Sequence, residues 1–343
     1  MAEQAASAPR LEVKMAEKID RASFLQKMEE VLQPMIDITA MYSSLVGGVI
    51  TDPVLMTLPI HDHAIVRGHA CFDTCSVVNG RLYRCDIHLD RHIASLGRAR
   101  IPLPYGTDAE SCKAAMREII AQTVVASGLR EANVRYYTSV GPGNFSILPA
   151  GCRTAFYVVI YPMTPDDPEE LKGAKEYTVD LPLKPGLLAT TKSTNYMLNA
   201  LTAMSSKERG GGYGILVDAE GNIAESCIMN CVFITKEKKL VTPPFDNILA
   251  GTTARKILEL SDVLLQEGLL TAVSQESVSL EAAKASEEML ICSGDTHIVP
   301  IVQWDDVAVG PGVVGPVSKR LMELVQKDAR EGTKDHYELV YPA

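Results

Sequence analysis

A turn-rich segment near the middle of the chain constrains the fold more than any other feature. Residues 162–175 contain three prolines, four acidic residues and Gly173, a composition that interrupts regular structure. Strand-like and helical patterns occur on both sides of it. At 343 residues the chain is long enough for two domains. The sequence therefore predicts an α/β (α+β) fold of two domains joined at this segment.

Four regions follow from this division. We expect an N-terminal arm and helix, a small α/β domain, a linker and a larger second domain. Their predicted bounds are 1–40, 41–162, 163–176 and 177–343. The strongest local prediction is a hairpin of residues 72–78 and 81–85, because Asn79-Gly80 suits a type I′ turn. Helices are predicted at 88–100, 107–127, 196–209, 252–267 and 315–327, and strands at 133–140, 154–161, 177–181, 223–234 and 289–292.

Composition excludes several classes of protein. The net charge of −10 argues against a nucleic-acid partner, and no apolar run reaches the about 18–20 residues that span a bilayer. The N-terminus lacks the apolar core of a secretory signal. The eight cysteines show no C-x-x-C spacing, which favours free thiols in a reducing compartment. We expect a cytoplasmic protein, or one of a plastid or other organelle if a presequence has been removed.

Lys192 and Glu225 carry the clearest chemical signal. Lys192 lies in Ala-Thr-Thr-Lys-Ser-Thr-Asn-Tyr, among small and hydroxyl residues without carboxylates nearby. Such an amine can lose its proton near neutral pH and attack an aldehyde. Glu225 follows a turn and could hold a protonated pyridine nitrogen. Together they indicate a pyridoxal phosphate enzyme, whereas each residue taken alone also fits a solvent-exposed loop or strand face.

Arg91 and two loops could bind a phosphate group. Arg91 lies at the start of a predicted helix, and its planar guanidinium can form two hydrogen bonds to a phosphate. Residues 247–255 place small and hydroxyl side chains at a helix N-terminus, and residues 292–296 follow a predicted buried strand. Ordinary helix capping and a solvated arginine are the alternatives.

A metal site is not predicted. His61-Asp62-His63 is the only tempting spacing, but its two histidines would point to opposite faces of an extended segment. No third ligand is close in the sequence.

The order of these motifs resembles one known family. Phe72-Asp73, His88-x-x-Arg91, Lys192-x-x-Asn-Tyr196, Ala-Glu225-Ser, Leu-x-Gly-Thr252-Thr253 and Ser-Gly-x-Thr296 follow one another as in class IV, fold type IV pyridoxal phosphate aminotransferases. The resemblance covers roughly residues 45–325. It is closest to the plant-type branch of D-amino-acid aminotransferase-like proteins and aminodeoxychorismate lyases.

The resemblance implies a cofactor in the cleft between the domains, and roles for single residues. Lys192 would form the aldimine and move the proton, Arg91 would grip the phosphate and Glu225 would face the ring nitrogen. Thr252, Thr253, Thr296 and Tyr196 would complete the cofactor site. Asp295 replaces a neutral residue of the family. Because an anion beside a phosphate is unfavourable unless it points away, Asp295 is left out of the predicted site.

The resemblance also frames the substrate. Arg135 and Tyr137 lie on one face of a predicted strand, and with Phe72 they are the expected substrate residues. We expect transamination between an amino acid, such as D-alanine, and a 2-oxo acid, in a homodimer. Branched-chain L-amino-acid transamination and 4-amino-4-deoxychorismate lyase activity are the alternative reactions, and a non-catalytic cofactor-binding relative is the alternative class.

Overall fold

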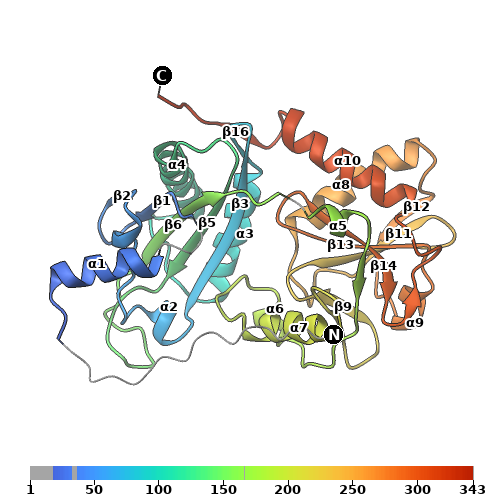
Figure 1. The fold of residues 1–343 in the computed structure, drawn as a ribbon, viewed down its shortest axis with the longest axis horizontal. Helices are drawn as coiled ribbons and strands as arrows, with labels where there is room; N and C mark the ends of the chain where they lie inside the picture. Colours follow the sequence, from blue (N-terminus) through green and yellow to red (C-terminus); the bar gives the residue numbers. More distant parts are fainter. Residues whose placement is uncertain (1–17, 33–36, 166, 343) are drawn as a thin grey trace.

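The computed structural model describes residues 18–32, 37–165 and 167–342, which form two sheets flanked by helices (Figure 1). The first sheet has seven strands in the order β16-β4-β3-β5-β6-β1-β2, and all its pairs are antiparallel. Its strands are β1 (Ala40–Ser43), β2 (Gly48–Ile50), β3 (Ala70–Val78), β4 (Arg81–Tyr83), β5 (Ala132–Ser139), β6 (Ala155–Pro162) and β16 (His336–Glu338). Around it lie α1 (Arg21–Leu32), η1 (Pro53–Leu55), α2 (His63–Val66), α3 (Cys85–Arg98) and α4 (Ala109–Ser127).

The predicted hairpin is confirmed. Asn79 and Gly80 both have positive φ, 52° and 73°, as a type I′ turn requires. The turn pairs Val78 with Arg81, and α3 begins at Cys85, directly after the short strand β4. This connection places the helix that carries His88 and Arg91 beside β3.

Alternation along β5 divides the first sheet into two faces. Ala132, Val134 and Tyr136 are fully buried against α3 and α4. Asn133 and Arg135 lie on the other face, which is only partly buried and turns toward the rest of the molecule. The strand therefore offers polar side chains to the space between the two sheets.

The second sheet has the order β12-β11-β10-β13-β14-β15, with β7 added beside β14. Most pairs are antiparallel, but β11–β12 and β14–β7 are parallel. A separate pair, β8–β9, stands next to it. The strands are β7 (Ala174–Glu176), β8 (Ile215–Val217), β9 (Ile223–Ser226), β10 (Asn230–Ile234), β11 (Lys239–Thr242), β12 (Ala272–Gln275), β13 (Glu288–Ser293), β14 (His297–Trp304) and β15 (Val307–Ala308).

Helices α8 (Thr252–Gln266) and α10 (Pro316–Glu331) cover one face of the second sheet, and Leu264, Leu321 and Val325 fill the core between them (Figure 1). A second core surrounds the fully buried Trp304. The remaining helices are α5 (Pro168–Leu171), α6 (Gly186–Ala189), α7 (Met197–Glu208) and α9 (Leu280–Lys284).

The structure differs from the predicted layout in three places. β7 lies within the predicted linker and pairs with the second sheet, while residues 177–181 contribute only an isolated bridge at Thr178. β16, near the C-terminus, crosses back and pairs with β4 of the first sheet. The predicted strand 223–234 is two strands, β9 and β10. Residues 1–17 of the predicted arm lie outside the described residues.

Two further properties concern the described part of the chain. Within it, no helix combines the length and apolar character needed to span a bilayer. The same ranges hold no group of three or more histidine, cysteine or acidic side chains that could bind a metal ion. Asp62, between the two histidines of the tempting spacing, instead caps α2 and accepts hydrogen bonds from Ser139 and Tyr157. All eight cysteines are free, and all but Cys152 are buried.

Candidate active site

Most of the predicted site residues meet at a cavity of about 420 Å³ between the two sheets. The first sheet and its helix contribute Phe72, Arg91 and Arg135. The second half of the chain contributes Glu225 and Thr252. Lys192 and Tyr196 reach the cavity from the segment between α6 and α7. Residues far apart in the sequence therefore form one pocket, as enclosed ligand sites between domains do.

The backbone around Lys192 is held against the first sheet. The N–H of Phe72 donates to the carbonyl of Lys192 at 2.9 Å, and Thr194 N–H donates to the carbonyl of Ala70 at 3.0 Å. The Lys192 N–H donates to Ser95 Oγ on α3 at 3.2 Å. These bonds fix the lysine relative to Arg91 on the same helix.

The Lys192 amine has an unusual environment. Its Nζ lies 3.4 Å from the hydroxyl of Tyr196 and 4.8 Å from the centre of the Phe72 ring. Burial, together with the positive charge of Arg91, lowers the pKa of Lys192 to about 8. A neutral amine is accessible near physiological pH, which is the form needed for nucleophilic attack and proton transfer.

Arg91 is held in place by a buried carboxylate. Its Nε and Nη2 donate to the two oxygens of Asp73 at 2.9 and 2.7 Å, and its Nη1 donates to the carbonyl of Ala250 at 3.1 Å. Burial alone would raise the pKa of Asp73, but the positive charges of Arg91 and His88 hold it well below its ordinary value. The guanidinium is thus a fixed cation at one end of the cavity.

Glu225 stands on β9 and is 9 % exposed. Burial raises its pKa to about 7, although the nearby Lys184 opposes this shift. The backbone N–H of Leu249 is its hydrogen-bond partner, at 3.4 Å from Oε2. A carboxyl in this state readily forms a charged pair when a protonated ring nitrogen is placed beside it.

The start of α8 brings hydroxyls and free N–H groups to the cavity. Thr252 lines it, and the buried Oγ1 of Thr253 has no hydrogen-bond partner among the described residues. Gly251 is the N-cap residue, and a Cβ there would lie 1.9 Å from Asn230 Oδ1, so glycine allows the close approach. An anion at this helix end would meet donors that no group of the described chain satisfies.

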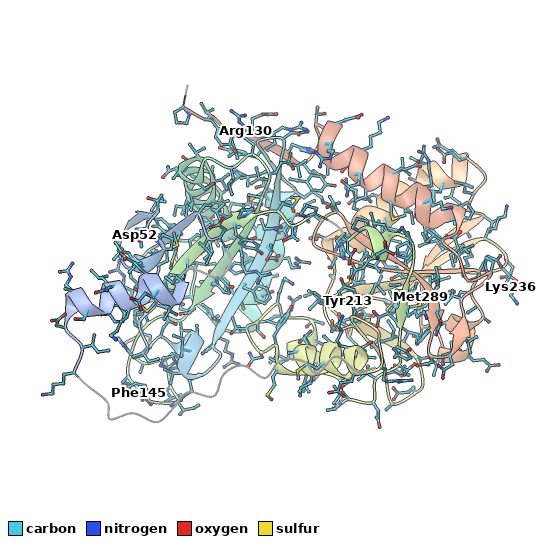
Figure 2. The ribbon with its side chains drawn as sticks, in the orientation of Figure 1. Asp52, Arg130, Phe145, Tyr213, Lys236 and Met289 are labelled. Carbon is cyan, nitrogen blue, oxygen red and sulfur yellow. The ribbon has the colours of Figure 1, made fainter. Side chains whose placement is uncertain are left out.

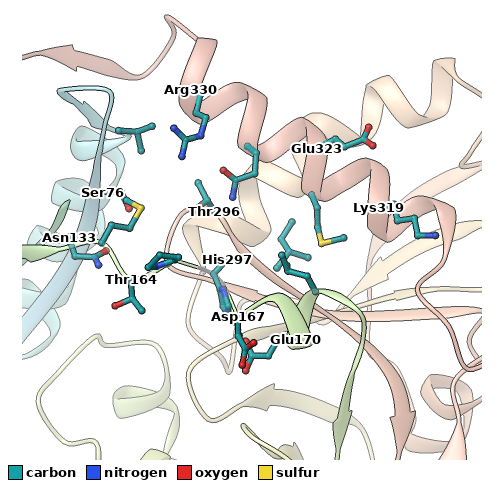
Figure 3. Close-up of a pocket in the computed structure, with 18 residues that line it drawn as sticks. Ser76, Asn133, Thr164, Asp167, Glu170, Thr296, His297, Lys319, Glu323 and Arg330 are labelled. Carbon is teal, nitrogen blue, oxygen red and sulfur yellow. Dashed lines mark ion pairs between the residues drawn. The ribbon is translucent and has the colours of Figure 1, made fainter. Parts of the chain in front are cut away.

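Three predicted residues lie outside the lining of this cavity. They are Thr253, which follows Thr252 at the start of α8, Thr296 and Tyr137. Thr296 lines a neighbouring crevice of about 1020 Å³ beside α5 and α10, as Figure 3 shows. The β13–β14 turn reaches the lysine cavity with Ser293 and Gly294 instead. Tyr137 is on the same face of β5 as Arg135, but it stacks against Phe72 with ring centres 5.9 Å apart. The roles of Thr296 and Tyr137 in cofactor and substrate binding therefore stay predictions.

Arg135 is placed to meet a small anion. Its Nε donates to Thr74 Oγ1 at 3.1 Å, and its guanidinium lies 5.6 Å from the Phe72 ring centre and 6.0 Å from that of Tyr161. Within the described ranges, no carboxylate forms an ion pair with it. The aromatic rings orient the side chain without neutralising its charge.

Sequence reasoning missed several residues of the site. Asp73 stands beside Phe72 in a recognised motif, yet its pairing with Arg91 requires the α3–β3 contact. Strand alternation places Asn133 with Arg135 and could have identified it. Tyr161 also lines the cavity, and no local pattern marks it.

The cavity fits pyridoxal phosphate. Lys192 would be the covalent attachment point, Arg91 and the α8 N-terminus would hold the phosphate, and Glu225 would pair with the ring nitrogen. The unsatisfied Thr253 hydroxyl and the lowered pKa of Lys192 are what such a ligand requires. When bound, this cofactor supplies an aldehyde carbon and a protonated ring that withdraws electrons.

Fold and cavity together place Lys192, whose pKa is lowered to about 8, and Arg91 on the wall of one pocket between the two sheets. The model of the family described as amino-transferase class IV matches residues 70–304. The D-amino-acid transaminase, chloroplastic, of Arabidopsis thaliana is 41% identical over 296 residues, covering 85% of this chain and 77% of the relative. The chain therefore belongs to the class IV aminotransferases, and it is a pyridoxal phosphate-dependent aminotransferase.

Relatives of lower sequence identity are also aminotransferases. The D-alanine aminotransferase of Bacillus licheniformis is 23% identical over 269 residues, covering 78% of this chain and 90% of the relative. Among solved structures, the branched-chain amino acid aminotransferase of Thermobaculum terrenum in its PLP-form has a TM-score of 0.72 and 18% identity, covering 87% of this chain and 96% of that chain. The Escherichia coli branched-chain enzyme has a TM-score of 0.76 and 21% identity, covering 88% and 100%. These structures confirm the predicted fold type.

Proposed function

We propose that this enzyme transfers the amino group between a D-amino acid, such as D-alanine, and a 2-oxo acid. The observation that carries the D-amino-acid assignment is the 41% identity to the chloroplastic D-amino-acid transaminase, spread over 85% of the chain. The similarity to branched-chain enzymes is low in identity and supports the fold alone.

The roles of the site residues are part of the same proposal. Lys192 is the catalytic residue that attaches the cofactor and carries the proton, and its lowered pKa supports this role. Arg91, Thr252 and Thr253 bind the phosphate. Arg135 binds the carboxylate of the substrate, because it is a cation on the cavity wall without a carboxylate partner in the part of the chain that the structure describes.

Half-reactions test the substrate. The purified chain loaded with pyridoxal phosphate is mixed with D-alanine, L-alanine, L-leucine or 4-amino-4-deoxychorismate, and the loss of the visible absorbance band is followed. We expect a fast loss with D-alanine, yielding pyruvate and the pyridoxamine form. Lys192→Ala is the control and should show no amino transfer. A reaction with L-leucine alone, or release of 4-aminobenzoate from aminodeoxychorismate, would overturn the D-amino-acid assignment.

We also propose that the enzyme is a homodimer that pairs through an apolar edge near the cavity. The loop between β5 and β6 exposes Phe145, Ile147 and Leu148 at 66%, 75% and 66%. Figure 2 labels Phe145 on this loop. Met197 on α7 is 75% exposed, and α2, α6 and α7 lie along the same side of the molecule (Figure 1). Exposed apolar groups of this kind are typical of protein interfaces. Light scattering after size-exclusion chromatography tests this state, and a monomeric mass would refute it.

Two remaining assignments follow the same lines. We infer two domains, each built on one sheet, with β16 returning to the first. Limited proteolysis should cut first near residues 163–173 if the junction lies there.

The compartment that we propose is the cytoplasm, and a plastid is the alternative supported by the chloroplastic relative. Imaging of the full-length gene product fused to a fluorescent protein distinguishes the two.

A further inference from the structure

Asp295 is a buried acid at the boundary between the two halves of the molecule. It lies in the turn between β13 and β14, is 1% exposed and has a φ of 68°. Its Oδ2 accepts a hydrogen bond from the Ser76 N–H on β3 at 3.0 Å. Its Oδ1 lies 2.5 Å from Nε2 of His88 on α3. A side chain of the second sheet is therefore bound by a strand of the first sheet and by the helix that packs on it.

Further hydrogen bonds connect His88 to Arg91, the proposed phosphate ligand. The other ring nitrogen of His88, Nδ1, lies 2.9 Å from Asp73 Oδ1, and Asp73 holds Arg91 through two hydrogen bonds. The chain of contacts is thus Asp295, His88, Asp73 and Arg91. The residue just before Asp295 is Gly294, which lines the cavity that Arg91 also lines.

The charges of these four contacting side chains balance one another. Burial alone would favour the neutral imidazole, but Asp295 and Asp73 raise the pKa of His88 to about 9. Arg91 Nη2 also approaches His88 Nδ1 at 3.3 Å, so the imidazolium faces two carboxylates and one cation. Two anions and two cations are therefore packed together, which explains how Asp295 is tolerated beside a phosphate site.

We propose that Asp295 is a positioning residue that couples the β13–β14 turn to Arg91 through His88 and Asp73, and so sets the geometry of phosphate binding. This inference rests on the proposed role of Arg91 as the phosphate ligand. Arg91 stands on the first half of the molecule, while Gly294 and Thr252 stand on the second. Asp295 is a buried carboxylate that joins the two walls, so it fixes the spacing between the donors that a phosphate must reach simultaneously.

The test compares two ligands that differ only in the phosphate. Apoenzyme of the full chain is titrated with pyridoxal phosphate and with pyridoxal, and the dissociation constants are measured from the visible absorbance band. Asp295→Ala should weaken pyridoxal phosphate on the order of tenfold or more, because charge-assisted contacts lose their geometry. Pyridoxal should change less than about twofold. A general folding defect would weaken both ligands together.

Asp305→Ala is the matched control. Asp305 has a similar backbone, with a φ of 51°, and also anchors a turn, accepting hydrogen bonds from Thr178 and Lys284. It does not line the cavity. This variant should lower the stability of the protein and leave the ratio of the two dissociation constants unchanged.

Asp295→Asn provides a second measurement with a conservative change. The amide can accept from Ser76 N–H and donate to a neutral His88, so both hydrogen bonds are kept when the imidazole is uncharged. Without one carboxylate neighbour, the pKa of His88 should fall. We expect this variant to bind pyridoxal phosphate with wild-type affinity at about pH 9. At about pH 6 we expect a loss of affinity on the order of tenfold, because the N–H of a charged His88 and the amide NH2 would then be two hydrogen-bond donors facing each other.

The outcomes separate the two proposals. If wild-type enzyme does not prefer pyridoxal phosphate to pyridoxal, or Arg91→Gln keeps the preference, the phosphate role of Arg91 fails. If wild type and Arg91→Gln behave as expected but Asp295→Ala binds pyridoxal phosphate as tightly as wild type or more tightly, the positioning role of Asp295 fails alone. The same conclusion follows if Asp295→Asn shows no loss at low pH.

Discussion

Lys192 should lower the free energy of unfolding of the cofactor-free protein at neutral pH. Replacing it with an apolar residue should therefore stabilise the fold. The pKa of the amine is about 8 in the folded protein against an ordinary value of 10.5. At about 1.4 kcal/mol per pH unit, the charged amine costs the folded state about 3 kcal/mol. The unfolded chain therefore binds this proton more tightly, and the cost is fully present below pH 8. It fades as the pH rises toward 10.5, so stability increases across that interval.

The variant Lys192→Met tests this reasoning in apoenzyme. Its free energy of unfolding, measured by urea titration, should exceed that of wild type by about 3 kcal/mol at about pH 7 and by less than about 1 kcal/mol at about pH 10.5. Lys113→Met is the control, because Asp90 raises the pKa of Lys113 and its loss should be neutral or slightly destabilising. A Lys192→Met protein no more stable than wild type at neutral pH would refute the reasoning.

Four further outcomes can be measured. Arg91→Gln should weaken pyridoxal phosphate on the order of a hundredfold, with little effect on pyridoxal, as seen by absorbance titration. Glu225→Gln should reduce kcat on the order of a hundredfold, because the ring nitrogen loses its anionic partner, and stopped-flow half-reactions would show the step affected. Arg135→Leu should raise KM for both amino and 2-oxo acids by about tenfold or more, and unchanged steady-state constants would exclude its carboxylate role. Phe145→Asp should shift the protein toward a monomer in light scattering, because a charge in an apolar interface is costly.

The sequence predicted those parts of the fold that local chemistry determines. Asn79-Gly80 fixed the hairpin because both residues accept a positive φ, and alternation identified the face of β5 that carries Arg135. The pairing of β16 with β4 could not be predicted, because the two strands, at residues 81–83 and 336–338, are far apart in the sequence. A strand of three residues contains too little pattern to indicate such a partner.

The site residues also differ in whether the local sequence was enough to predict their position. Lys192, Arg91 and Glu225 are marked by residue types that their chemistry demands, and the structure brings them to one cavity. Thr296 does not line this cavity, because a shift of a residue or so in a tight turn reverses the direction of a side chain. Positive φ at both Gly294 and Asp295 bends the turn, and this bend is not visible in the pattern of hydroxyl residues.

Asp295 shows why charge alone is a poor guide to a site. The sequence argument excluded this acid because an isolated anion would repel a phosphate. In the folded protein the acid is not isolated, because the same contact that buries it brings His88 and the Asp73–Arg91 pair within hydrogen-bonding distance of one another. Since a buried carboxylate without its cation would be strongly destabilising, Asp295 and His88 depend on each other. An acid in this turn therefore requires a histidine on the first turn of α3 as its partner, and replacing one without the other should cost more than replacing both.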